Sequence, residues 1–397
     1  MLVDLALVNA TVATMVGDGY GLVTDASIGI VDGRIEFVGQ SRPAADTTVD
    51  VGGRLVTPGL VDPHTHLVFG GNRATEFESR LGGATYAELN EAGGGIRSTV
   101  AATRFSSTDE LARSAALRLG WLVGNGATTV EVKTGYGLDL QTEVRMLDAI
   151  DRLRGGDADL HVTLMAAHTV PEEFADDREG YIRLLVDEVI PAAVGRADSI
   201  DVFVETIGFS ADEAERILSA GRAAGLGVAV HADQLTLGEG CHLAARYGAR
   251  SADHLEHADE AAVAALAEGG VVPVLIPGAS SFLDEAARPP IDLFRSHGLP
   301  MAVATDLNPG TSPTASLPLA MHLACVRFGL TPLEALRGAT TAAAAALGLD
   351  DRGRLAEGLR ADVAIWDVEH PAELSYWVGA PLCATTVVGG SLTKDLR

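Results

Sequence analysis

The chain has 397 residues, with 29 Lys and Arg against 54 Asp and Glu, and a formal net charge of −25. This charge argues against nucleic acid as a partner, because phosphate backbones are bound by clustered cations and the sequence has no basic stripe. Hydrophobic residues make up 47% of the chain and charged residues 21%, a globular composition that excludes disorder as the main state.

Both ends of the chain are rich in short strands. Before residue 58, alternating apolar residues predict strands over 4–14, 27–31, 34–38 and 54–57. After residue 350, the same pattern predicts strands over 361–366, 385–388 and 391–392. Two β-rich ends therefore bracket a different central part.

In the central part, strand-like and helix-like segments alternate. Apolar runs predict eight strands, over 59–66, 127–133, 160–168, 200–205, 227–231, 251–254, 271–276 and 301–306. Helices are expected between them, for example over 108–123, 140–153, 211–224, 237–247 and 259–268, with a capping box at Ser210 and Glu213. Strands that are apolar on both faces and alternate with helices form parallel sheets. We therefore expect an α/β fold with a (β/α)₈ TIM-type barrel, and a doubly wound open sheet is the alternative.

The cysteines and the hydropathy pattern bear on the compartment. The three cysteines, Cys241, Cys325 and Cys383, are too few and too widely spaced for a disulfide framework or a thiolate zinc cluster. No apolar run reaches the roughly 18 residues of a membrane span, and residues 1–9 lack the basic start of an export signal. We therefore expect a cytoplasmic protein with no membrane partner.

Histidines gather where the predicted strands end, which is where the catalytic groups of a TIM barrel lie. Of the 11 histidines, five stand at such ends, namely His64, His66, His168, His231 and His254. His64 and His66 are two residues apart, so both project from the same face of a strand, although such a pair alone is a weak signal. With His231 and Asp306 the set offers three nitrogens and one oxygen and leaves room for water, which suits Zn²⁺ and also Fe²⁺.

Several longer segments resemble one enzyme family. They are residues 58–73, 93–96, 131–139, 167–171, 251–255 and 304–311, which together span nearly the whole chain. The chain resembles the amidohydrolase superfamily, in the form carried by the enzymes that open an imidazolone ring in histidine degradation. The resemblance implies hydrolysis of a cyclic carbon–nitrogen bond, from 4-imidazolone-5-propanoate to N-formimidoyl-L-glutamate, in a cytoplasmic homodimer. It also implies one metal ion per subunit, Zn²⁺ or Fe²⁺/Fe³⁺.

With this resemblance we expect three parts in the chain. Residues 58–350 form the barrel, and residues 1–57 and 351–397 together form one small β-sandwich domain. The resemblance implies His64, His66, His231 and Asp306 as metal ligands. It implies substrate contacts from Arg73, Tyr136, His168, Gln234, Asn308, Gly310 and Thr311. Catalysis is then assigned to Asp306, which moves a proton, to His254, which bonds the attacking water or the oxyanion, and to Gln234.

The chain departs from many relatives at Gln234, where they carry a Glu three residues after the fifth-strand His. An amide takes up no proton, so we expect Gln234 to orient water or substrate and Asp306 to act as the base. Asp233 should point away from the site if its strand continues. Lys133 is expected to be an ion-pairing residue beside a single metal, because the fourth strand ends in Glu205 rather than in a lysine.

Other readings remain open at this stage. Arg73 has a surface ion pair with Glu76 or Glu78 as its alternative role. Another mononuclear amidohydrolase, acting on a cyclic amide or amidine, is the alternative enzyme, whereas Gln234 argues against a base deaminase. An inactive metal-binding scaffold or a sugar-binding barrel is the alternative outside enzymes, and metal analysis of the purified chain separates it from a hydrolase.

Overall fold

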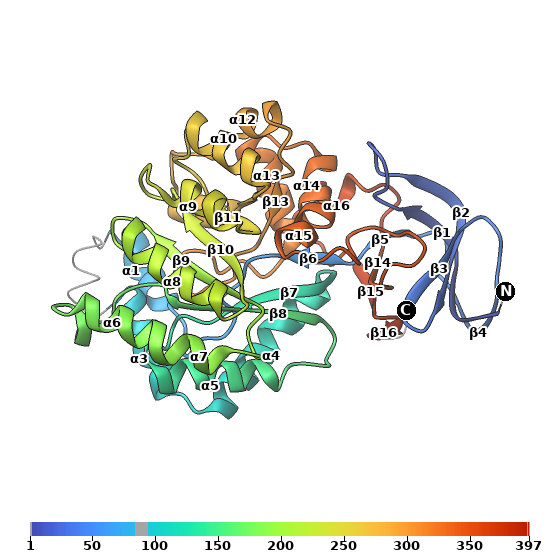
Figure 1. Cartoon of the computed structure of the whole chain (residues 1–397). Coiled ribbons are helices and arrows are strands. Elements are labelled where there is room, and N and C mark those ends of the chain that lie inside the picture. Colours follow the sequence, from blue (N-terminus) through green and yellow to red (C-terminus); the bar gives the residue numbers. More distant parts are fainter. Residues whose placement is uncertain (1, 84–93, 395, 397) are drawn as a thin grey trace.

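The computed structural model describes residues 2–83, 94–394 and 396. Gly93, the first residue of the segment 93–96 that resembles the family, lies outside the described residues. It contains two bodies, a barrel wrapped by helices and a smaller sheet beside it (Figure 1). Strands from both ends of the chain share the sheet at the right of the view. The expected α/β barrel with an added β domain is confirmed, while the division at residues 57 and 350 stays a prediction.

The smaller sheet joins strands from both ends of the chain. Its order is β16-β15-β14-β5-β1-β2-β3, and β4 pairs with β1. The strands are β1 (Leu2–Ala13), β2 (Leu22–Val31), β3 (Arg34–Gly39), β4 (Ala44–Asp50), β5 (Leu55–Pro58), β14 (Val363–Trp366), β15 (Cys383–Val388) and β16 (Ser391–Leu392). β14 lies antiparallel to β5, which places the C-terminal strands next to the N-terminal ones. The sequence did not predict β4 because its residues are mostly polar and exposed.

Alternating apolar residues of this sheet form a core of their own. Leu7, Ile28, Ile30, Val363 and Ile365 are among its fully buried members. Trp366 instead joins the sheet to the barrel, since it belongs to the barrel core and its indole Nε1 donates to Thr57 Oγ1 at 2.8 Å. A Cβ at Gly126, which has φ +91, would overlap the Trp366 ring, so glycine is required at this contact.

The barrel has eight parallel strands in the order β13-β12-β11-β10-β9-β8-β7-β6. They are β6 (Leu60–Asp62), β7 (Ala127–Lys133), β8 (Asp159–Ala167), β9 (Ser199–Val204), β10 (Gly227–Ala232), β11 (Ser251–His254), β12 (Val272–Leu275) and β13 (Ala302–Val303). All eight predicted strands are present. The open-sheet alternative is wrong, because the chain beyond β6 bridges to the chain beyond β13: His66 N donates to Leu307 O at 3.0 Å, and Asp306 N donates to His64 O at 2.9 Å.

Helices follow the strands around the barrel. They are α1 (Ala74–Leu81), α3 (Ile96–Phe105), α4 (Thr108–Gly124), α5 (Leu140–Asp151), α6 (Arg178–Leu184), α7 (Ile190–Ala193), α8 (Ala211–Ala223), α9 (Gly240–Tyr247), α10 (Glu260–Gly269), α11 (Pro277–Leu283), α12 (Ile291–Ser296), α13 (Leu317–Phe328), α14 (Pro332–Gly338), α15 (Thr341–Ala346) and α16 (Glu373–Tyr376). A 3₁₀ turn (Glu172–Phe174) and a π-helical turn (Leu185–Val189) flank α6. No helix among the described residues is long and apolar enough to cross a membrane.

Two helix starts show how the sequence specifies these boundaries. The predicted capping box at Ser210 and Glu213 is confirmed at the start of α8. Helix α9 begins at Gly240, three residues later than predicted, because the preceding turn is held by carboxylates: Leu235 N and Thr236 N donate to Glu205, and Gly238 N donates to Asp233.

Candidate metal centre and active site

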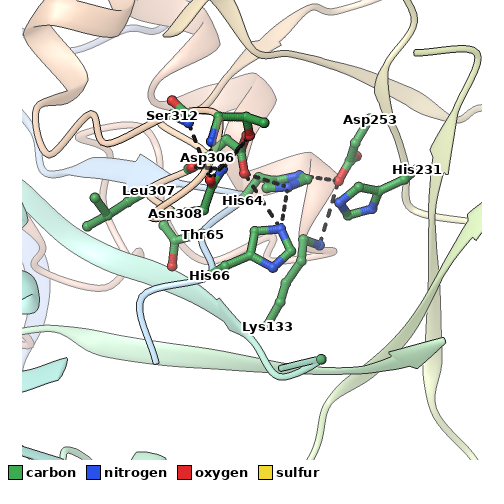
Figure 2. Close-up of polar contacts among 12 residues, drawn as sticks. His64, Thr65, His66, Lys133, His231, Asp253, Asp306, Leu307, Asn308 and Ser312 are labelled. Atoms are coloured by element: carbon green, nitrogen blue, oxygen red, sulfur yellow. Dashed lines mark hydrogen bonds and ion pairs between the residues drawn. The ribbon is translucent and has the colours of Figure 1, made fainter. Parts of the chain in front are cut away.

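Three predicted metal ligands converge at the carboxyl ends of the first and last barrel strands (Figure 2). His64 Nε2 lies 3.2 Å from His66 Nε2. Asp306 Oδ1 lies 3.4 Å from His64 Nε2 and 3.6 Å from His66 Nε2. All three side chains are buried, and their ligand atoms lie within 4.8 Å of one another, as the binding of a single ion requires.

The histidines of β10 and β11 complete the cluster. The ring centroid of His231 lies 4.5 Å from that of His64 and 5.3 Å from that of His254. One ligand atom from each of His64, His231 and His254 also lies within 4.8 Å of the others. The four predicted ligands thus lie in two overlapping groups that share His64, and His254 is a further nitrogen in the group that contains His231.

The chemistry of these donors fits a metal ion. Burial lowers the pKa of His64 and His66 well below the usual value, so both imidazoles are neutral and hold a free lone pair. Burial raises the pKa of the Asp306 carboxyl well above its usual range, a direction that a bound cation would reverse. Two nitrogen atoms 3.2 Å apart beside a carboxylate oxygen form a set that zinc and iron prefer.

Four residues near the ends of the barrel strands have unusual backbone conformations. Asp233, His254, Leu255 and Asp306 have φ angles of +48, +79, +71 and +50, in the left-handed region that non-glycine residues rarely adopt. Each lies where a barrel strand ends or just beyond it. Such conformations cost about 1–3 kcal/mol each and persist where surrounding contacts hold them, commonly at functional sites.

A hydrogen-bonded layer closes the barrel beneath the ligands. Thr305 donates to Asp62 twice, from Oγ1 to Oδ2 at 2.6 Å and from its backbone N to Oδ1 at 3.1 Å. Burial raises the pKa of Asp62 to about 7. These bonds join the first strand to the last directly below His64 and Asp306, and the sequence analysis did not identify them.

Tyr136 and His168, the substrate contacts that the resemblance implies, lie against the cluster. The His168 ring stacks on His66 at 5.1 Å, and the Tyr136 ring lies 5.4 Å from His168 and 5.8 Å from His66. Burial lowers the pKa of His168 to about 4 and raises the pKa of Tyr136 above its ordinary value. Both groups are therefore neutral hydrogen-bonding side chains at neutral pH.

Glu143, which the sequence analysis missed, shapes the loop that carries Tyr136. Its buried carboxylate accepts hydrogen bonds from the backbone N–H groups of Gly135, Gly137 and Leu138, at 3.2, 2.8 and 2.9 Å. The signal available in the sequence was a Glu in register with the apolar positions Met146, Leu147 and Ile150 of the same helix.

Arg73 forms an ion pair with Glu76, one of the two pairings given as its alternative role. Its guanidinium contacts both oxygens of Glu76, with Nε 3.0 Å from Oε2, and Glu76 also accepts from Gly95 N at 2.9 Å. The pair is mostly buried, with side-chain exposures of 15% and 21%. Nη1 of Arg73 occupies the space that a Cβ at Gly310 would fill, so the guanidinium also faces the 308–312 loop.

Asn308 organises the loop after the last strand. Its Nδ2 donates to Asp306 O at 2.8 Å and to Thr311 Oγ1 at 3.0 Å. Its Oδ1 accepts from the backbone N–H groups of Gly310 and Thr311 at 2.8 and 2.7 Å. Both ends of the amide are therefore engaged within the loop, and these contacts fix the backbone next to Asp306.

Asp233 and Gln234 directly follow the end of β10. Asp233 turns away from the cluster and accepts from Gly238 N and Cys241 Sγ, each at 3.0 Å, which confirms the predicted direction. The reason differs from the predicted one, because the strand ends at Ala232 and Asp233 has a positive φ. Gln234, the next residue, is half-buried.

This fold and this donor cluster agree with the comparisons. Residues 55–393 match the amidohydrolase family model, and the chain belongs to the amidohydrolase family. A variant of the atrazine chlorohydrolase of Arthrobacter aurescens, complexed with zinc and atraton, has the same fold, with a TM-score of 0.74 at 19% identity over 99% of this chain and 95% of that chain.

Within the family, the chain is similar over nearly its whole length to imidazolonepropionases. That of Photobacterium profundum is 48% identical over 408 residues and covers 99% of both chains. That of Sphingopyxis alaskensis is 50% identical over 376 residues, covering 94% of this chain and 93% of the relative. The chain is therefore a member of the imidazolonepropionase group of amidohydrolases.

Proposed function

We propose that the chain hydrolyses 4-imidazolone-5-propanoate to N-formimidoyl-L-glutamate, the third step of histidine degradation. The full-length identity of 46–50% to imidazolonepropionases carries this proposal. The buried cluster of His64, His66, His231 and Asp306 supports it, since such a cluster fits the metal that this hydrolysis requires. The proposed ion is Zn²⁺ or Fe²⁺/Fe³⁺, held by these four residues.

The residues in and around the cluster are assigned separate chemical roles. A bound metal ion supplies a Lewis acid that polarises the ring carbonyl and makes water acidic near neutral pH. Asp306 accepts the proton of the attacking water and delivers it to the departing ring nitrogen. His254 donates a hydrogen bond to the oxygen that becomes negative in the transition state. His168, stacked on His66, and Tyr136, tilted against His168, bind the ring from one side.

Arg73 is proposed to bind the substrate propanoate, since its guanidinium faces the loop at Gly310. Glu76 is already paired with it, so the substrate carboxylate shares this cation or displaces Glu76. Arg73→Ala is expected to raise KM roughly 10–100-fold and to change kcat little, because a charge-assisted pair to the unreacting tail is lost. Steady-state kinetics test this. Glu78→Ala, an exposed change on the same helix, is the control, and an unchanged KM for Arg73→Ala would rule out the assignment.

Gln234 is proposed to orient water or substrate without transferring a proton. Gln234→Ala is expected to lower kcat only about two- to tenfold, the effect of one neutral hydrogen bond. Stopped-time assays of Gln234→Ala, run in parallel with Asp306→Ala, measure this decrease in kcat. A loss as large as that of Asp306→Ala would show that proton transfer passes through position 234.

The deciding experiment is a spectrophotometric assay with freshly generated imidazolone propanoate. Disappearance of the substrate absorbance, loss of activity after chelation and recovery with added Zn²⁺ or Fe²⁺ are expected. Absence of turnover by protein that holds one equivalent of metal would contradict the substrate and leave the metal centre intact. The resemblance also implies a cytoplasmic homodimer, and light scattering coupled to size-exclusion chromatography tests the oligomeric state.

A further inference from the structure

A buried ammonium group lies directly beneath the histidine cluster. Lys133 ends β7, and its side chain is 1% exposed. Its Nζ lies 2.7 Å from Glu131 Oε1, 2.8 Å from Asp201 Oδ2 and 3.6 Å from Asp253 Oδ2. The predicted ion-pairing role of Lys133 is thus confirmed, but three carboxylates around one ammonium are more than a simple pair needs.

These carboxylates have the arrangement of a cation site. They come from three alternate strands of the barrel, β7, β9 and β11, and all three are buried. One donor atom from each of Asp201, His231 and Asp253 lies within 4.8 Å of the others, and Asp253 Oδ1 has no hydrogen-bond partner within the part of the chain that the structure describes. A second divalent ion could bind such a set if no other cation were there.

We propose that the Lys133 ammonium is the resident cation of this second site and so restricts the chain to one metal ion. Isolated buried carboxylates are strongly unfavourable, and the ammonium compensates them without a second ion. Lys133 and Lys394 are the only lysines in the chain, so no other ammonium could take this place.

The same contacts orient the metal-binding imidazoles. Asp201 Oδ2 faces both Lys133 Nζ and, at 2.9 Å, Nδ1 of His231, although the ring is not aligned for a regular hydrogen bond. Asp253 Oδ2 likewise faces Lys133 and, at 2.6 Å, Nδ1 of His64 (Figure 2). Because an ammonium only donates, both oxygens act as acceptors, and the short contact with Asp253 Oδ2 places the hydrogen of His64 on Nδ1. The Nε2 lone pair of His64 is then left for the metal, whereas Nδ1 of His231 only faces its carboxylate oxygen.

The inference rests on the proposed metal centre but not on the substrate. The test is the zinc stoichiometry of metal-free protein, measured by titration against a chromophoric chelator and by elemental analysis. The wild type and Lys133→Arg are expected to bind about one equivalent, and Lys133→Ala about two. Adding Asp201→Asn to Lys133→Ala should return the value to about one. Arg352→Ala is the matched control, because it removes another buried cation that pairs with carboxylates, Asp159 and Asp351, away from the cluster.

The outcomes separate this inference from the proposed function. A wild type that binds no zinc contradicts the proposed metal centre itself. A wild type with one equivalent and a folded Lys133→Ala that also binds one would overturn only the role of Lys133. If Lys133→Ala does not fold, the wild type and Lys133→Arg still decide, because a second tight equivalent in either shows that the cation at position 133 does not exclude a metal ion.

Discussion

Replacing Asp306 by alanine is expected to lower kcat/KM by at least about a thousandfold, because the change removes a metal donor together with the proton carrier. Asp306 Oδ1 lies within 3.6 Å of both His64 Nε2 and His66 Nε2, and its carboxylate is buried among them. No other described carboxylate stands in the donor group of His64 and His66. Steady-state assays and metal analysis of the same preparation measure the two losses together.

The control for this variant is Asp233→Asn. Asp233 is also a buried carboxylate at the end of a barrel strand, but it bonds Gly238 and Cys241 rather than the cluster. We expect Asp233→Asn to keep about one equivalent of metal and most of its activity. Equal losses in both variants would show that Asp306 matters for the fold of this barrel end and not for chemistry.

The architecture could be predicted because strand and helix periodicity are local. Eight apolar runs separated by helical segments specify a parallel barrel, and each run was found as a strand. β4 was missed because it pairs with β1 through its backbone while its side chains are mostly polar and exposed. Backbone pairing leaves no trace in hydropathy when neither face of a strand is buried.

The convergence of the proposed metal ligands could also be predicted, since a barrel brings its strand ends to one rim. The contacts that surround these residues could not all be predicted from the sequence. That Asp62 bonds Thr305, 243 residues later, depends on closure of the barrel. That Glu143 fixes the loop of Tyr136 depends on side-chain geometry that spacing does not encode. For Arg73, spacing offered both Glu76 and Glu78 as ion-pair partners, and the structure selects Glu76.

Glu256, beside the active site, is a further residue whose surroundings could not be predicted from the sequence. Its side chain is 1% exposed, and neither oxygen has a hydrogen-bond partner among the described residues. Oε2 lies 4.0 Å from Nδ1 of His254, whose Nδ1 is likewise unpartnered. Its position after two residues of positive φ, His254 and Leu255, is what brings it back toward His254.

His254→Asn is expected to lower kcat about 10²–10³-fold while the metal content stays near one equivalent, because one donor to the developing oxyanion is lost and the ligands remain. Burial lowers the pKa of His254 to about 3, so the imidazole is neutral at every pH above about 4 and gains no proton in the working range. The pH profiles of kcat/KM for wild type and His254→Asn should therefore have the same shape between pH 5 and 9 and differ only in height.

His257→Ala, an exposed histidine three residues further on, is the control and should behave as wild type. Loss of metal from His254→Asn would instead identify His254 as a ligand, which its position within 4.8 Å of His64 and His231 would then explain. An acidic limb present in the wild-type profile and absent from the variant would show that His254 works in its protonated form. Because burial and the neighbouring His231 both disfavour a charge on this ring, we expect neither result.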